Sequence, residues 1–272
     1  MGAGLFTDPW RTLPGSEETL RFLKQYKPQN EQATRLRILL SGPDDAGKSS
    51  FINSVDSVFQ GRVTDRAPTD AISGSSYTQK YKTYKIYKEP QSFYNFIFND
   101  IMGFESDKGV RVEDVKLALK GHIKEGYEFN SDHHLNENDN SYNPAPTMDD
   151  RVHVLVYVVP VGSVSLLSED MVKKMREVRM AARDLGIPQL AILTKPDVAC
   201  PEVNENINNL HKSKILKEQV DKFSVLLGFP LKNIFLVKNY NSEIITTNDM
   251  NTPILSTLRQ MVMFGEDFLN DQ

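Results

Sequence analysis

Short runs of apolar residues, each followed by polar residues, are the clearest pattern along the chain. The run HVLVYVVP at residues 153–160 is continuous and rich in β-branched residues, as is typical of a strand with both faces buried. RLRILLSG at 35–42, QLAILTKPD at 189–197 and NIFLVKN at 233–239 also pair an apolar run with a polar exit. We predict a strand at each of these four places.

Two further strands are predicted early in the chain, after a Gly-, Ser-, Thr- and Pro-rich loop at residues 60–76. YTQKYKTYKIY at 77–87 alternates lysines with aromatic residues, which favours an edge strand whose lysines face solvent. SFYNFIFND at 92–100 follows closely and is predicted to pair with it. The two strands would form an antiparallel hairpin.

Helical periodicity separates the strands. Met171, Met175, Val178, Ala182 and Leu185 are spaced by four and three residues, so they are predicted to form one apolar helix face. Ser168 is placed to cap that helix, and a Gly and a Pro follow its end. Helices are predicted at residues 17–25, 48–59, 111–123, 168–185, 213–227 and 253–268.

The order of these elements indicates an α/β fold. A strand, a helix, two strands and a helix are followed by three strand–helix pairs, which predicts a six-stranded, mainly parallel sheet. One strand would be antiparallel, and helices would cover both faces. Ligands of such sheets bind at the carboxyl ends of the strands, so the functional residues are expected directly after strands.

Composition narrows the classes of protein. The chain has 272 residues and a net charge of −4, which predicts a globular domain without broad affinity for nucleic acid or membranes. It has one cysteine and neither a transmembrane segment nor a signal sequence is evident, so a cytoplasmic location is expected. We predict an N-terminal extension (1–34) packed on one domain (35–272), with a long Asn- and Asp-rich loop at 124–150.

The sequence SGPDDAGKSS at residues 41–50 matches the P-loop pattern in full, between a predicted strand and a predicted helix. In a P-loop, main-chain amides surround the phosphates of a nucleotide. Lys48 is expected to reach the outer phosphates and act in catalysis, and Ser49 to bind Mg²⁺. The other phosphate-binding residues predicted here are Gly42, Asp45, Ala46, Gly47 and Ser50.

A second pair of residues fits the same site. Asp100 and Gly103 follow the second hairpin strand, where the carboxylate would hold Mg²⁺ through water and the Gly103 amide would meet a γ-phosphate. A threonine before the edge strand should complete the metal site. Thr78 is favoured as this metal-binding and catalytic residue, and Thr64 and Thr69 stay open as alternatives.

The turn Thr194-Lys195-Pro196-Asp197 is the most informative for nucleotide choice. A carboxylate at Asp197 can accept hydrogen bonds from guanine N1 and its exocyclic amine, a pair of donors that adenine lacks. The aliphatic part of Lys195 would cover the base. Lys238 and Asn239 end the last strand and are predicted to lie near the base, although a plain turn is an equal alternative.

With these motifs assembled, the chain resembles the GTP-binding domain of the interferon-induced protein 44 and 44-like family. The resemblance extends over nearly the whole chain. It rests on the stretches DPWRTL, RILLSGPDDAGKSSFINSV, SGSSYTQKY, NDIMGFE, LKGHIKEGYEFN, ILTKPD and VKNYNSE. It implies a Ras-like fold and a link to interferon responses and antiviral defence. Members often carry an additional N-terminal domain, and we expect none in this chain because only 34 residues precede the first predicted strand.

Two departures from small GTPases predict slow hydrolysis of GTP. Asp44 and Asp45 stand where small GTPases often have glycine, and Phe104 stands where a Gln orients the attacking water. We therefore expect a slow GTPase switch, dependent on a second copy or a partner protein for fast turnover. The alternative is a GDP- and GTP-binding scaffold without useful hydrolysis. A P-loop nucleotide kinase is disfavoured by Asp197.

Overall fold

A six-stranded sheet forms the centre of the molecule. The computed structural model describes residues 6–69, 80–105 and 109–272. In sequence order the strands are β1 (Leu36–Ser41), β2 (Lys82–Glu89), β3 (Ser92–Asp100), β4 (Val154–Pro160), β5 (Gln189–Thr194) and β6 (Ile234–Val237). Their order in space is β2-β3-β1-β4-β5-β6. Only β2 is antiparallel to its neighbour, so the predicted mainly parallel architecture is confirmed.

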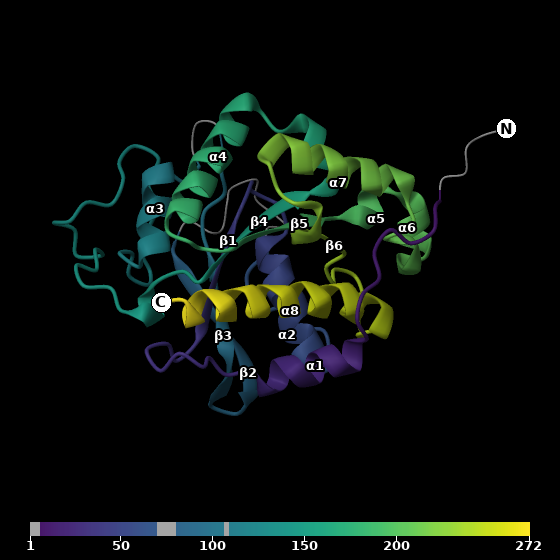
Figure 1. Cartoon of the computed structure of the whole chain (residues 1–272), viewed down its shortest axis with the longest axis horizontal. Helices are drawn as coiled ribbons and strands as arrows, with labels where there is room; N and C mark the ends of the chain where they lie inside the picture. Colours follow the sequence, from purple (N-terminus) through teal and green to yellow (C-terminus); the bar gives the residue numbers. More distant parts are fainter. Residues whose placement is uncertain (1–5, 70–79, 106–108) are drawn as a thin grey trace.

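Helices cover both faces of this sheet, as Figure 1 shows. One face carries α1 (Ser16–Gln25), α2 (Lys48–Gln60) and α8 (Asn248–Asn270), and the other carries α3 (Val112–Lys120), α4 (Glu169–Asp184) and α7 (Lys214–Leu227). The short helices α5 (Pro196–Ala199) and α6 (Pro201–Glu205) follow β5. In the described parts of the chain, no helix is long and apolar enough to cross a bilayer.

Alternation along β1 explains how one sheet serves two cores. Leu39 packs in the core beneath α3, α4 and α7, whereas Ile38 and Leu40 pack beneath α1, α2 and α8. Successive strand residues point to opposite faces, so a strand covered on both sides must be apolar at nearly every position. The same alternation runs along β4, which explains its unbroken apolar sequence.

The helix α4 confirms the predicted cap and corrects the predicted face. Ser168 Oγ accepts a hydrogen bond from Met171 N at 3.2 Å. Met171 is only half-buried, and Leu185 is 38% exposed because it is the C-cap residue beyond the last helical turn. The buried face consists instead of Val172, Met175, Val178 and Ala182.

The closing helix α8 begins five residues earlier than the sequence suggested. Thr247 caps it by accepting a hydrogen bond from Met250 N. Pro253 therefore lies in the second turn and not at the start. A proline there removes one main-chain donor, while the apolar residues that follow hold α8 against the sheet.

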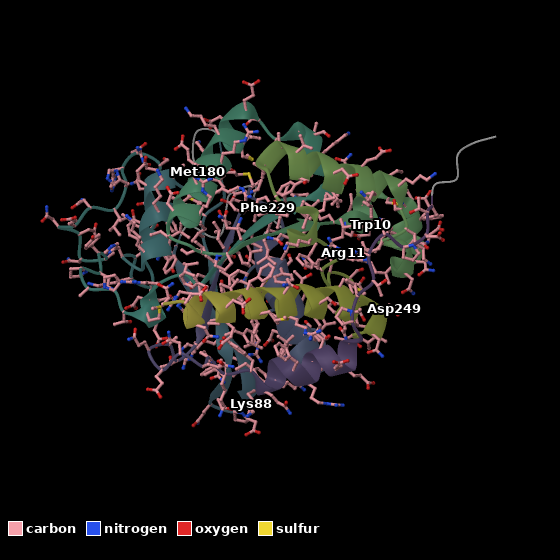
Figure 2. All side chains as sticks on the ribbon, in the orientation of Figure 1. Trp10, Arg11, Lys88, Met180, Phe229 and Asp249 are labelled. Atoms are coloured by element: carbon pink, nitrogen blue, oxygen red, sulfur yellow. The ribbon has the colours of Figure 1, made fainter. Side chains whose placement is uncertain are left out.

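The N-terminal segment lies along the outside of the domain. Trp10 packs edge-on against His211, with 4.9 Å between the ring centroids, and the Arg11 guanidinium donates to the carbonyl oxygens of Ile234 and Leu231 (Figure 2). The following helix, α1, packs on α8. Arg11 thus satisfies one carbonyl group of the edge strand β6 and one of the short 3-10 helix that precedes it.

The Asn- and Asp-rich segment 124–150 packs against α3. Its side chains accept hydrogen bonds from main-chain N–H groups two residues later, as Asn130 does from Asp132 and Asp139 does from Ser141. Such local bonds replace a regular ladder. The buried Asp114 carboxylate accepts from Leu135 N at 2.8 Å and so connects the segment to α3.

Two buried histidines make the stability of this fold depend on pH. Arg37 N donates to His153 Nδ1, so the proton of the neutral ring lies on Nε2, 2.9 Å from the Met148 carbonyl oxygen. Burial lowers the pKa of His153 from 6.5 to about 4, and burial likewise lowers the pKa of His211 to about 4. Both rings are therefore neutral in the folded protein at pH 7.

We expect the free energy of unfolding to fall as the pH falls from 6.5 towards 4. The unfolded chain takes up protons there that the folded chain cannot hold, so each histidine contributes a loss of up to about 3 kcal/mol. Urea unfolding across this range should show a smaller loss in His153→Gln than in the wild type. The exposed His133→Gln variant should behave as the wild type does, and equal pH dependence in all three proteins would contradict this account.

Candidate functional site

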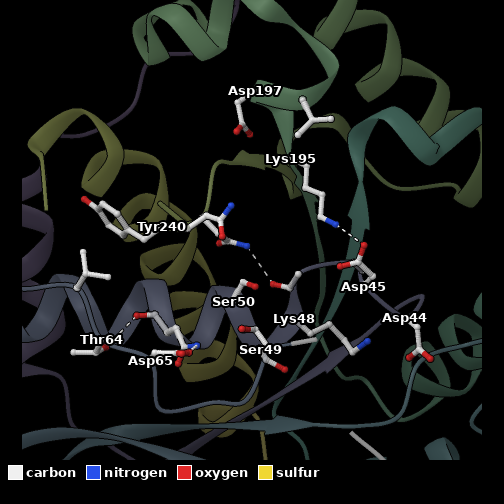
Figure 3. A pocket seen from close by; sticks show the side chains of 18 residues that line it. Asp44, Asp45, Lys48, Ser49, Ser50, Thr64, Asp65, Lys195, Asp197 and Tyr240 are labelled. Atoms are coloured by element: carbon white, nitrogen blue, oxygen red, sulfur yellow. Dashed lines mark hydrogen bonds and ion pairs between the residues drawn. The ribbon is translucent and has the colours of Figure 1, made fainter. Parts of the chain in front are cut away.

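A cavity of about 470 Å³ opens at the carboxyl end of the sheet (Figure 3). Its walls come from the turn between β1 and α2, the first two turns of α2, the segment after α2, and the turns that follow β5 and β6. The lining residues are Asp44, Asp45, Ala46, Gly47, Lys48, Ser49, Ser50, Asn53, Val63, Thr64, Asp65, Thr69, Lys195, Asp197, Val198, Asn239, Tyr240 and Asn241. The structure therefore brings most of the predicted site residues together.

Two glycines allow the turn to approach its neighbours. Gly42 has φ 151°, and a Cβ there would lie 2.0 Å from the Val158 carbonyl oxygen. Gly47 has φ 89° at the N-cap of α2, and a Cβ there would lie 3.1 Å from Asn239 Nδ2. No described side chain caps the start of α2. Its first main-chain N–H groups therefore lack a side-chain partner beside the cavity, which suits an anion.

Lys48, Ser49 and Asp100 form a polar cluster beside this turn, in which Lys48 and Asp100 are buried and Ser49 is half-buried. Lys48 Nζ donates to the Pro43 carbonyl oxygen at 2.9 Å, and Ser49 Oγ donates to Asp100 Oδ2 at 2.6 Å. Burial raises the pKa of Asp100, while Lys48 and Ser49 oppose that rise. Asp100 Oδ1 is buried without a hydrogen-bond partner among the described residues, so this cluster fits a cation better than it fits an apolar neighbour.

The two carboxylates in the P-loop point to different partners. Asp45 adopts φ 53°, and its carboxylate pairs with Lys195 Nζ at 2.8 Å. Asp44 Oδ1 accepts a hydrogen bond from Gly103 N at 3.0 Å. The Gly103 amide, predicted to meet a γ-phosphate, is thus occupied by a side chain of the protein itself.

The far end of the cavity is built from the turns after β5 and β6. Thr194 Oγ1 donates to the Ala46 carbonyl oxygen at 2.6 Å, and Asn239 Nδ2 donates to the Gly47 carbonyl oxygen at 3.2 Å. Both side chains therefore position the P-loop. Asp197 lines the cavity half-buried, and the described residues contain no hydrogen-bond or ionic partner for its carboxylate. Lys238 is not brought to the cavity, because it pairs with Glu243 at 2.9 Å.

The three threonine candidates are separated by the structure. Thr78 lies outside the described residues. Thr64 lines the cavity, but its hydroxyl donates to Asp56 Oδ2 at 2.7 Å, behind the wall. Thr69 also lines the cavity and is exposed. Thr69 and Thr78 therefore stay open as metal ligands, whereas Thr64 would have to release Asp56.

Asn53 is the main site residue that sequence reasoning missed. Its amide oxygen accepts from Arg66 N and Ala67 N, and its Nδ2 donates to Asp65 Oδ1 and the Ala67 carbonyl oxygen. It thereby fixes residues 65–67 as a wall of the cavity. Helical spacing offered a signal, since Asn53 follows Ser49 and Ser50 by four and three residues. Val63, Val198 and Tyr240 gave no comparable signal.

These features define the class of protein. A P-loop between β1 and α2, an Asp at the end of β3 and a carboxylate after β5, on this strand order, constitute a Ras-like P-loop GTPase fold. No family model matches the chain.

The chain is 33% identical to human interferon-induced protein 44-like, over 92% of this chain and 56% of that protein. It is 34% identical to mouse interferon-induced protein 44 (93% and 60%) and 33% identical to the human protein (93% and 57%). The resemblance to the interferon-induced protein 44 and 44-like family is thus confirmed. The chain spans a little over half the length of these relatives.

Among solved structures, Toc33 from Arabidopsis thaliana in complex with GDP and Mg²⁺ aligns with a TM-score of 0.48 at 13% identity, covering 94% of this chain and 93% of that one. A probable GTP-binding protein, engB, aligns with a TM-score of 0.44 at 13% identity, covering 87% and 99%. Similarity at this level says nothing about the ligands of this chain.

Because Gly42 touches β4, we expect Gly42→Ala to destabilise the protein more than Gly61→Ala does. Both positions have positive φ, but a Cβ at Gly61 meets nothing within 4 Å. In Gly42→Ala, overlap with the Val158 carbonyl oxygen should reduce the free energy of unfolding by a further amount of about 1–3 kcal/mol. This loss comes in addition to the strain of placing alanine at positive φ, which occurs in both variants. Chemical unfolding measures the difference, and equal losses in the two variants would contradict the close approach seen here.

Proposed function

We propose that this chain binds GDP and GTP with Mg²⁺ in the cavity between the P-loop and Asp197. The observation that carries the proposal is that a phosphate-binding turn and a carboxylate without a described partner line the same cavity from distant parts of the sequence. Its volume of about 470 Å³ lies within the range of small-molecule sites.

The P-loop end supports phosphate binding. The main-chain amides at the start of α2 and the ammonium of Lys48 would hold the diphosphate. Ser49 and Asp100, with Thr69 or Thr78, would hold Mg²⁺, which neutralises phosphate charge when bound. The positive charge of Mg²⁺ would matter because the lining of the cavity carries more carboxylates than lysines. In the described parts of the chain, no group of three or more His, Cys, Asp or Glu residues could hold a metal alone, so the nucleotide itself would supply ligands.

The Asp197 end supports selection of guanine. Its carboxylate would accept hydrogen bonds from the N1–H and amine groups of the base, and adenine would leave it unpaired. The aliphatic part of Lys195 would lie against the ring while its ammonium stays with Asp45. Asn239 contributes by positioning the P-loop, because its side-chain amide donates to the Gly47 carbonyl oxygen.

Slow hydrolysis follows from what surrounds the P-loop. Phe104 is fully buried and packs in the core under α3 and α4, so it neither orients water nor leaves room for a residue that would. No arginine appears among the described residues lining the cavity. The burial of Phe104 also favours the second candidate, a nucleotide-binding scaffold without useful hydrolysis. The relatives are named as interferon-induced proteins, which supports a role in interferon responses.

We expect Asp197→Ala to weaken binding of both GDP and GTP by about 10- to 100-fold, because two hydrogen bonds to a charged acceptor are lost. Binding of ATP should change little, so the preference for guanine should collapse. Calorimetry with Mg²⁺ measures all three, with the exposed Asp184→Ala variant as the control. Equal binding of GTP and ATP by the wild-type protein would contradict guanine selection.

Single-turnover phosphate release should be slow, at about 10⁻⁴ s⁻¹ or below, because Phe104 replaces the water-orienting Gln and no described arginine lines the cavity. If a second copy of the chain supplies an arginine to the site, the rate of phosphate release should rise with protein concentration. A fast rate that is independent of concentration would refute the slow-GTPase proposal. Absence of turnover together with tight binding would favour the scaffold.

A further inference from the structure

The P-loop is fastened to the segment after β3 by contacts at Asp44 and at the two residues before it. Gly103 N donates to Asp44 Oδ1 at 3.0 Å, and Phe104 N donates to the Gly42 carbonyl oxygen at 3.0 Å. Pro43 and Phe104 also form a parallel β-bridge. The fit at Gly103 is tight, because a Cβ there would lie 2.1 Å from Asp44 Oδ1.

This contact involves the group that a third phosphate would need. Under the proposed function, the main-chain amide of Gly103 is the donor expected to meet the γ-phosphate. A carboxylate and a phosphate oxygen are both anionic acceptors, and one N–H group donates one good hydrogen bond. The two anions also repel at such distances. GTP and the Asp44 carboxylate therefore compete for this amide, whereas GDP has no group that does.

We infer that Asp44 is a specificity-determining residue that makes this site favour GDP over GTP by holding the Gly103 amide itself. The inference rests on the proposed function. Before GTP could reach that amide, the hydrogen bond from Gly103 would have to break and the carboxylate would have to turn away. The contacts of Phe104 with the P-loop hold the two segments close together, so the competition is built into the fold.

The surroundings of Asp44 add to this preference. Asp100 is close enough to Asp44 for the two carboxylates to repel each other. A γ-phosphate would bring further negative charge to this pair of carboxylates. Lys48, the nearest buried cation, is bonded to the Pro43 carbonyl oxygen at 2.9 Å, which directs its charge toward the loop.

Asp45 provides a contrast within the same turn. Figure 3 shows the two carboxylates pointing to different places, that of Asp45 toward Lys195. Asp45 therefore carries the same charge at the next residue of the chain, and its carboxylate pairs with Lys195 instead. Neutralising Asp45 changes the charge of the P-loop by the same amount as neutralising Asp44, so it separates a general charge effect from competition for that amide.

The test is the ratio of the Kd for a non-hydrolysable GTP analogue to the Kd for GDP, measured by calorimetry with Mg²⁺. The wild-type protein should bind GDP at least about tenfold more tightly. In Asp44→Ala the ratio should fall by about tenfold or more, mainly through tighter binding of the analogue. Asp44→Asn keeps the shape of the side chain and should lower the ratio by less.

Asp45→Asn should alter both Kd values by a similar factor and leave their ratio unchanged. The inference is overturned if the wild type binds both nucleotides equally, or if both Asp44 variants keep the wild-type ratio. The isosteric Asp44→Asn variant decides the matter if Asp44→Ala does not fold. A wild-type protein that binds GDP but shows no effect of Asp44 refutes this inference alone, whereas one that binds no guanine nucleotide refutes the proposed function with it.

Discussion

The site depends on the close approach of the P-loop to β4 and to the turn after β6. Gly42 lies so near the Val158 carbonyl oxygen that no side chain fits between them, and Gly47 lies against Asn239. These contacts let α2 start at the edge of the sheet and point its first amides into the cavity. Glycine at both positions allows a backbone conformation that other residues adopt at a cost. The geometry of the cavity therefore depends on main-chain packing at Gly42 and on the side chains of Thr194 and Asn239, which hold the P-loop at Ala46 and Gly47.

Charged groups in the site are satisfied mostly by the protein itself. Lys48 is bonded to its own loop, Asp45 to Lys195, and Asp44 to the Gly103 amide. A buried or half-buried charge without a partner is costly, so these internal contacts stabilise the protein without a ligand. The binding free energy of a ligand is therefore only the difference between the contacts that it makes and the internal contacts that it replaces. This is why the oxygens left without described partners, at Asp100 and Asn239, matter more than the groups already paired.

One wall of the cavity is firmly held to α2. The sequence suggested a mobile loop from residue 60 onward, but residues 64–67 are connected to the helix through Asn53 and Asp56. Thr64 donates to Asp56, and Arg66 pairs with the same carboxylate at 3.2 Å. Such a network of buried hydrogen bonds opposes local opening. In the part of this loop that the structure describes, a change on nucleotide binding would therefore be expected beyond Ala67 first.

The sequence by itself determined the strands, most helices, the mainly parallel sheet and the place of the P-loop, because periodicity, caps and glycine positions act over a few residues. It also placed Asp197 and Ser49 at one edge of the sheet, since parallel strands end together. It did not determine where side chains in the turns point. Asp44 meets Gly103 across 59 residues and Asp45 meets Lys195 across 150, while Lys238 turns to Glu243 and away from the cavity. Only the tertiary structure decided these pairings, because the direction of a side chain in a turn follows from the local backbone angles and from partners that folding brings close.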